Sequence, residues 1–178
     1  MIRLFAAIAI PEHIGEGLVH HQHGLPGARW RPLESLHVTL RFFGDIAENA
    51  ADDLDAELSV IGGRPFDMTL SGVGTFGDGL DVDAVWAGVE EGEPARRLAA
   101  RCETAARRAG LKADTRVWRP HVTLAYLRGA EPVRVAAWVQ GHNLLKSPNF
   151  RVDAFGLYSS WRAEDGSRYR LERAYPLA

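Results

Sequence analysis

The sequence predicts an α+β fold in which antiparallel strands alternate with helices. Segments rich in β-branched and aromatic residues are separated by segments with helical periodicity. The tetrapeptide His-Val-Thr-Leu also occurs twice, at residues 37–40 and 121–124, each time in an apolar, strand-like context. The copies begin 84 residues apart in a chain of 178, which indicates an old duplication. Outside the motif no convincing repeat is found, so the sequence supports paired strands more firmly than paired lobes.

Seven strands are predicted from alternating or continuous apolar runs. They cover residues 3–10, 36–44, 68–76, 84–90, 120–127, 150–159 and 168–174. The dipeptide Asp165-Gly166 is typical of a hairpin turn between the last two. The glycine-rich, polar segments 24–29 and 75–83 are expected to be mobile loops at the border of an active site.

Helices are predicted at residues 12–20, 47–61, 94–109 and 132–140. The clearest is 94–109, because Pro94 suits the first turn and Gly110 suits the end of a helix. This helix contains the single cysteine, Cys102, which excludes an intramolecular disulfide. We predict that Cys102 is a packed small residue and not a nucleophile.

Length and composition indicate one domain spanning residues 1–178. With 46% hydrophobic residues, the chain can bury a sizeable core. A net charge of −2 argues against broad, non-specific coating of nucleic acid, so any RNA contact is expected to be local. No apolar run reaches 18 residues, and residues 1–10 lack the flanks of a signal peptide. We therefore expect a soluble, cytoplasmic protein without a membrane partner.

The repeated motif places chemistry on one face of each strand. Side chains alternate along a strand, so His37 and Thr39 point one way while Val38 and Leu40 point into a core. His121 and Thr123 repeat this arrangement. Residues two apart are separated by about 6.6 Å, so an imidazole and a hydroxyl can reach different oxygens of one phosphate.

Two such strands facing each other offer a base and an acid, which attack on a phosphodiester and departure of its alkoxide require. Histidine suits both roles because its ordinary pKa lies near neutrality. Either copy alone is read more readily as a half-buried, satisfied histidine. The matched pair favours the catalytic interpretation.

Each half also brings one arginine. Arg41 shares a face with His37 and Thr39, and Arg119 shares one with His121 provided that its strand begins by Arg119. A guanidinium there is well placed to hold phosphate oxygens. The alternative for either arginine is a solvated surface residue or an ion-pair partner.

The sequence resembles the two-histidine (2H) phosphoesterases, and within them the RNA 2′,3′-cyclic phosphodiesterases, also called 2′-5′ RNA ligases. The resemblance spans nearly the whole chain. It comprises the opening strand at residues 3–8 with Pro11, residues 30–32, residues 36–44, residues 119–125, and a closing hairpin with residues 157–160, Gly166, Tyr169 and residues 175–177. The paired motifs are specific to the superfamily, whereas the RNA branch rests on the flanking matches.

This resemblance implies two lobes of antiparallel sheet flanked by helices and related by a pseudo-twofold, with both motifs lining the cleft between them. It also implies metal-independent hydrolysis of RNA ends or nucleotide 2′,3′-cyclic phosphates to a 2′-phosphate by a monomer without cofactors. His121 is assigned as the base and His37 as the acid, and Thr39 and Thr123 hold the non-bridging oxygens. Reversal with an RNA 5′-hydroxyl gives 2′-5′ ligation.

Two alternatives remain open at this stage. The first is a 2H phosphoesterase acting on a small cyclic nucleotide or an ADP-ribose cyclic phosphate, because the chain is short and is not basic. The second is a non-catalytic RNA or nucleotide-binding module. Intact His and Thr in both copies argue against the second, since binding alone does not require two titrating groups.

Overall fold

The computed structural model describes residues 1–90, 92–164 and 166–178, and within them nine strands form one antiparallel sheet. The strands are β1 (Ile2–Ala9), β2 (Ala28–Trp30), β3 (His37–Ile46), β4 (Phe66–Asp78), β5 (Asp81–Glu90), β6 (His121–Leu127), β7 (Phe150–Val152), β8 (Ala154–Ala163) and β9 (Gly166–Pro176). The helices are α1 (Glu12–Val19), α2 (Glu48–Ser59), α3 (Glu93–Arg108) and α4 (Pro132–His142), with a 3₁₀ turn, η1 (Leu33–Ser35), before β3. All four predicted helices are confirmed.

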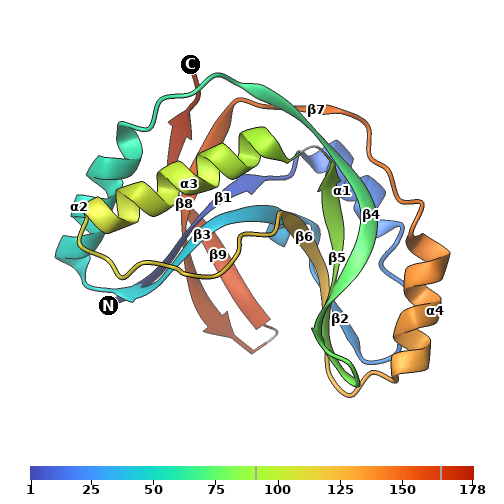
Figure 1. The fold of residues 1–178 in the computed structure, drawn as a ribbon. Helices are drawn as coiled ribbons and strands as arrows, with labels where there is room; N and C mark the ends of the chain where they lie inside the picture. The colour runs from blue at the N-terminus through green and yellow to red at the C-terminus, as the bar shows by residue number, and fades with distance from the viewer. Residues whose placement is uncertain (91, 165) are drawn as a thin grey trace.

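The strand order is symmetric about the contact between the two motif strands. The order is β7-β4-β5-β6-β3-β1-β8-β9, with β2 added against β6. On either side of the β6–β3 contact, β5 therefore corresponds to β1 and β4 to β8. Figure 1 shows α2 and α3 beside the half that contains β1 and β3, and α1 and α4 beside the half that contains β4 and β5. This confirms the predicted pair of lobes.

The two lobes meet through a narrow joint. Strands β3 and β6 pair only at Val38 and Val122, which occupy the same position in the two tetrapeptides. The ladders beyond the joint shift register at Leu40 in β3 and at Leu124 in β6, again the same motif position. A bulge there bends each strand, and in β6 it also shifts the alternation of buried and cavity-facing residues. The repeated sequence is thus matched by repeated local geometry.

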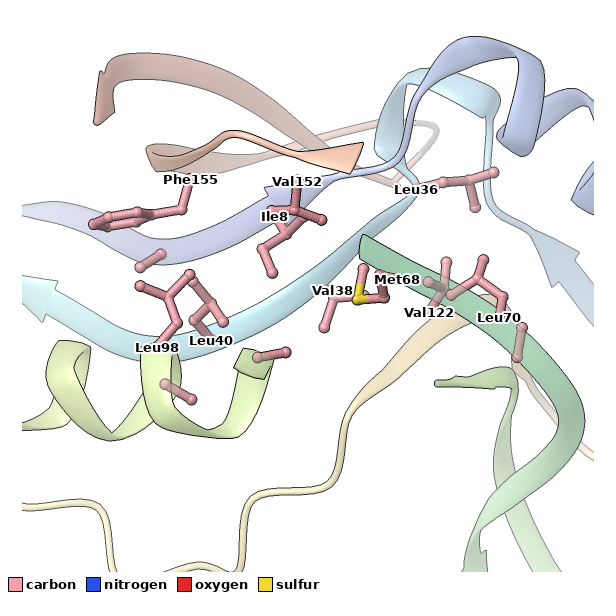
Figure 2. Packing of buried hydrophobic residues seen from close by; sticks show 14 of the residues in the cluster. Ile8, Leu36, Val38, Leu40, Met68, Leu70, Leu98, Val122, Val152 and Phe155 are labelled. Carbon is pink, nitrogen blue, oxygen red and sulfur yellow. The ribbon is translucent and has the colours of Figure 1, made fainter. Parts of the chain in front are cut away.

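A buried cluster continues through both lobes and fixes the motif strands. Val38 and Val122 are fully buried in it, together with Met68 and Leu70 of β4. Figure 2 shows Leu40 of β3 facing Leu98 of α3, the helix that packs on this strand. Burying such side chains supplies the main favourable free energy for holding the strands together.

Three predictions about the other elements are corrected by the structure. The segment predicted as one strand at residues 150–159 is two strands: β7 pairs with β4 and β8 with β1, so the chain changes lobe at Asp153. The segment 75–83 is not a loop, because β4 and β5 continue as a hairpin to Asp78 and from Asp81. The segment 24–29 already contains the start of β2.

Two further features bear on the sequence-based expectations. Of the predicted turn Asp165-Gly166, Asp165 lies outside the described residues, and Gly166 begins β9 at a φ of 131°. A left-handed φ of this size favours glycine. Among the described residues, none of the helices has both the length and the apolarity needed to cross a membrane.

Candidate active site

A cavity of about 680 Å³ opens where β3 and β6 meet. Its walls contain all six side chains predicted from the sequence. These are His37, Thr39, Arg41, Arg119, His121 and Thr123. The antiparallel pairing of Val38 with Val122 brings the two motifs together, because each valine is flanked by its own His and Thr on the cavity face.

His37 is enclosed by aromatic rings from β1 and β9 of its lobe. Its ring centroid lies 4.9 Å from that of Phe5 and 5.3 Å from that of Tyr169, which meets it edge-on. The pKa of His37 is lowered from 6.5 to about 4, and burial is the main cause. The Ser35 backbone opposes this shift, and the positive charges of Arg31 and His121 contribute to it. His37 is therefore neutral at pH 7 in the unliganded protein.

His121 has a matching environment in the other lobe. The ring of Phe76 meets it edge-on at 4.6 Å, and the ring of Trp86 lies 6.0 Å away. Its Nδ1 lies 2.6 Å from the Arg119 carbonyl oxygen. In the neutral imidazole, Nδ1–H therefore donates a hydrogen bond to this oxygen. Burial lowers the pKa of His121 and this hydrogen bond raises it.

Each histidine is influenced by the backbone of the residue two positions earlier. The Ser35 backbone raises the pKa of His37, and the Arg119 carbonyl accepts a hydrogen bond from Nδ1 of His121. A bond of this kind fixes the tautomer and the ring direction of a histidine. In His121 it leaves Nε2 for a substrate.

The threonines complete each half-site. Thr39 and Thr123 are half-buried on the same cavity wall as their histidines. Within the described residues, neither side-chain hydroxyl takes part in a hydrogen bond with the protein, whereas the Thr39 carbonyl accepts one from Trp118 Nε1 at 3.0 Å. The hydroxyls can therefore donate to a bound anion.

Arg41 lines the cavity but is held by partners in the protein. Its Nε lies 2.5 Å from Glu103 of α3, and its Nη1 lies 3.7 Å from Asp114. A third nitrogen donates to the Lys112 carbonyl at 2.7 Å. The burial of β3 alternates through Arg41, so Arg41 shares the cavity face with His37 and Thr39, as predicted, while its guanidinium is held by these partners.

Arg119 lines the opposite wall, and its side chain is exposed. The prediction for Arg119 required a strand that begins by this residue. In the structure β6 begins at His121, and Arg119 precedes it in irregular backbone. Arg119 acts on the site through its carbonyl, as described for His121. Among the described residues its guanidinium contacts no carboxylate.

Several residues that line the cavity are not predicted by the alternation of side chains along the motif strands. Strict alternation from His121 would place Ala125 on the cavity face, but Ala125 is fully buried and Tyr126 lines the cavity, because the bulge at Leu124 shifts the alternation by one residue. Tyr169 comes from β9, far along the sequence. Arg31 follows β2, a segment that the sequence predicts as loop.

One other candidate for chemistry, the single cysteine, lies outside this cavity. Cys102 is fully buried, and its burial raises the pKa of the thiol to about 12, so a thiolate nucleophile is disfavoured. No group of three or more His, Cys, Asp or Glu within the described part of the chain is arranged to hold a metal ion.

Comparison with known proteins places this arrangement in a family. A family model described as the 2′-5′ RNA ligase superfamily matches residues 11–164. The chain is 32% identical over 185 residues to an RNA 2′,3′-cyclic phosphodiesterase of Escherichia coli K12, covering 98% of this chain and 96% of that protein. It is 27% identical over 177 residues to a protein of the same name from Archaeoglobus fulgidus, covering 98% and 99%.

Solved structures agree with these relatives. The crystal structure of E. coli LigT complexed with 3′-AMP has a TM-score of 0.81 and 27% identity, covering 99% of this chain and 98% of that one. The match includes the lobes, the joint and both motif strands, since it extends over nearly all residues of both chains. The chain therefore belongs to the 2′-5′ RNA ligase superfamily, which confirms the resemblance drawn from its sequence.

Proposed function

We propose that this protein hydrolyses the 2′,3′-cyclic phosphate at RNA ends to a 2′-phosphate, without a metal ion. One observation carries the proposal: the pairing of Val38 with Val122 brings two identical His-x-Thr half-sites to one cavity. A cavity with two imidazoles and two free hydroxyls supplies two proton-transfer groups and two donors to phosphate oxygens.

The reaction needs one neutral and one protonated histidine. The neutral imidazole takes a proton from water as the water oxygen attacks phosphorus, and the bond between phosphorus and the ribose 3′ oxygen breaks on the opposite side. The imidazolium gives its proton to that leaving oxygen. Thr39 and Thr123 hold the non-bridging oxygens. Arginine, threonine and imidazolium, in place of a divalent ion, meet the charge that develops on phosphate.

The assignment of His121 as base and His37 as acid stays a prediction. In the unliganded protein the pKa of His37 is below the ordinary value for histidine, which opposes the protonated form that an acid needs. A bound phosphate anion acts in the other direction, because a negative charge beside an imidazole favours its charged form. The balance of these two effects decides which histidine carries the proton in the complex.

The relatives support the choice of substrate. Those in E. coli and A. fulgidus are named RNA 2′,3′-cyclic phosphodiesterases, and a structure of E. coli LigT is described as a complex with 3′-AMP. A nucleotide carrying a ribose phosphate is the kind of ligand that we propose for this cavity. Microscopic reversibility then allows an RNA 5′-hydroxyl to replace water, which gives 2′-5′ ligation without ATP.

The proposal is tested by turnover of a panel of 2′,3′-cyclic phosphates. The panel compares nucleoside 2′,3′-cyclic monophosphates, oligoribonucleotides ending in the cyclic phosphate, and an ADP-ribose cyclic phosphate, each with and without EDTA. We expect hydrolysis of RNA ends to a 2′-phosphate at the same rate in EDTA. His37→Ala and His121→Ala, which each remove a proton-transfer group, should lower the rate by about 10²- to 10⁴-fold. Strict dependence on Mg²⁺ or Mn²⁺, or no turnover of any member, would contradict the proposal.

A further inference from the structure

The arginines around the cavity differ in their partners. Arg41, Arg96 and Arg116 each have a carboxylate of the protein within salt-bridge distance. In the described part of the chain Arg31 and Arg119 have none. Arg119 is exposed to water, whereas Arg31 is only 6% exposed. Arg31 is therefore a buried cation without a protein anion beside it.

The backbone of Arg31 is fixed to β6. Its N–H donates to the Leu124 carbonyl at 2.8 Å, next to the bulge. The Gln22 side-chain amide donates to the Arg31 carbonyl at 2.9 Å and to the Leu124 carbonyl at 3.2 Å. These bonds tie Arg31 to the lobe that carries His121.

The side chain of Arg31 reaches across to the other lobe. Its guanidinium carbon lies 5.5 Å from the ring centroids of both Tyr126, in β6, and Tyr169, in β9. Its Nη2 donates to the Tyr169 hydroxyl at 3.2 Å. The same Tyr169 ring meets His37 edge-on. The guanidinium is thus held in one direction, on the His37 side of the cavity.

An arrangement of this kind is unfavourable until an anion arrives. A buried charge without a counter-charge has lost hydration, and two aromatic faces and one hydroxyl replace only part of it. A guanidinium presents several N–H donors in a plane that matches two oxygens of a phosphate. Because the two tyrosines already restrict the guanidinium, binding a phosphate costs little additional conformational entropy of the Arg31 side chain.

We propose that Arg31 binds a phosphate oxygen of the substrate on the His37 side of the cavity, the role that the sequence assigned to Arg41. This rests on the proposed function, in which the ligand is a phosphodiester. Arg41 already forms ion pairs with Glu103 and Asp114, whereas Arg31 has no carboxylate partner among the described residues. The binding groups are then Arg31 and Thr39 on one side and Arg119 and Thr123 on the other.

Binding of inorganic phosphate, measured by calorimetry, tests the anion site independently of turnover. We expect Arg31→Met to weaken phosphate binding by about 10- to 100-fold, as for loss of a charge-assisted hydrogen bond. Arg31→Lys keeps the charge but loses the planar fork, so its affinity should lie between the two. Arg29→Met is the matched control, because Arg29 lies two residues earlier, is exposed and does not line the cavity; it should bind as the wild type does.

Turnover of a nucleoside 2′,3′-cyclic monophosphate separates this proposal from the function itself. Arg31→Met should lose about 10- to 100-fold in kcat/KM while Arg29→Met keeps the wild-type value. A wild-type protein that binds phosphate through Arg31 but turns over no cyclic phosphate contradicts the function and supports the anion site. Phosphate affinity unchanged in Arg31→Met, or absent from the wild type, would overturn the role of Arg31 whatever the turnover.

An NMR titration of His37 distinguishes the proposed role of Arg31 from a merely structural one. The groups that act on His37 are Arg31 after β2, His121 in β6, Tyr169 in β9 and the Ser35 backbone. Removing the positive charge in Arg31→Met should raise the pKa of His37, and circular dichroism should show an unchanged fold. If Arg31→Met does not fold, Arg31→Lys decides: full phosphate affinity in that variant would contradict a planar guanidinium contact.

Discussion

His37 lies in surroundings that oppose a charge on its imidazole. Aromatic rings of Phe5 and Tyr169 cover its imidazole, and Arg31 adds a positive charge nearby. A base that must be neutral before it accepts a proton benefits from such surroundings, whereas an acid needs a bound anion to offset them. The protonation of this one side chain is therefore linked both to folding and to substrate binding.

This linkage predicts a pH-dependent contribution to stability. The pKa of His37 is about 4 in the folded protein and near 6.5 in the unfolded chain. The unfolded chain thus binds more protons between these values, and the free energy of unfolding falls as the pH drops from about 6.5 to 4. Above pH 6.5 the contribution is fully present. It amounts to as much as about 3 kcal/mol.

The measurement compares wild type and His37→Gln by urea unfolding from pH 4 to 8. The variant lacks the titrating ring, so the difference in unfolding free energy between the two proteins should narrow or reverse toward pH 4. His13→Gln serves as the control because His13 is exposed on α1. A difference that stays constant over the whole range would show that burial does not hold His37 neutral.

At the scale of elements, the attachment of α3 to β3 depends on one partly buried ion pair. Arg41 and Glu103 expose only 9% and 26% of their side chains, and Glu103 also accepts the Asp114 backbone N–H at 3.2 Å. Glu103→Gln leaves the Arg41 cation with a weaker partner. We expect the free energy of unfolding to fall by about 1–3 kcal/mol.

The matched control is Glu93→Gln on the same helix. Glu93 pairs with Arg97 at 3.1 Å, but the two side chains are 60% and 72% exposed, so its loss should cost about 0.5 kcal/mol or less. Equal effects of the two substitutions, measured by chemical unfolding, would show that the buried pair does not secure α3 to β3.

The sequence predicts those elements whose periodicity is uninterrupted. For α3, Pro94 and the apolar positions led to the correct helix, and the alternation in the tetrapeptides placed His37, Thr39, His121 and Thr123 on one face. The 75–83 hairpin was missed because its strand ends are polar and glycine-rich, which is typical of a loop. Cross-strand pairing, which the local sequence does not encode, extends those strands.

Long-range structure decides which site residues could not be predicted. Strict alternation from His121 leads to Ala125, but the extra residue at Leu124 brings Tyr126 to the cavity. Arg41 lies on the predicted face, but its guanidinium pairs with Glu103, 62 residues further along the chain. Arg31 and Tyr169 reach the site through long-range pairing of β2 with β6 and of β9 with β8. None of these arrangements can be recognised from about ten consecutive residues of the sequence.

At the scale of the whole molecule, the joint at Val38 and Val122 makes the two lobes depend on each other. Both valines are fully buried in the cluster that continues through the lobes. Val122→Ala should lower the free energy of unfolding by about 1–3 kcal/mol, because it opens a space in a packed core. Since the lobes share this core, tryptophan fluorescence and circular dichroism should still report a single coincident transition.

The exposed Val60 after α2 supplies the control. Its side chain is 71% exposed, so Val60→Ala should leave the transition unchanged. Two separate transitions in the wild type would show that the halves fold independently, in contrast to the prediction of one domain over residues 1–178.

His37 and His121 are proposed to act as one acid–base pair on a bound phosphate. The decisive experiment follows log kcat/KM from about pH 3.5 to 9 for wild type, His37→Asn and His121→Asn, a range that includes the pKa of both imidazoles. The wild type should give a bell, since the rate rises as the base loses its proton and falls as the acid loses its own. Because kcat/KM reports the free enzyme, in which the pKa values of both imidazoles lie below 6.5, the maximum should fall on the acidic side of neutrality. Each variant should lose one limb in its residual activity, and the limb lost from His37→Asn identifies its role. A wild-type profile that is flat over this range would contradict the pairing, because histidines titrate within it.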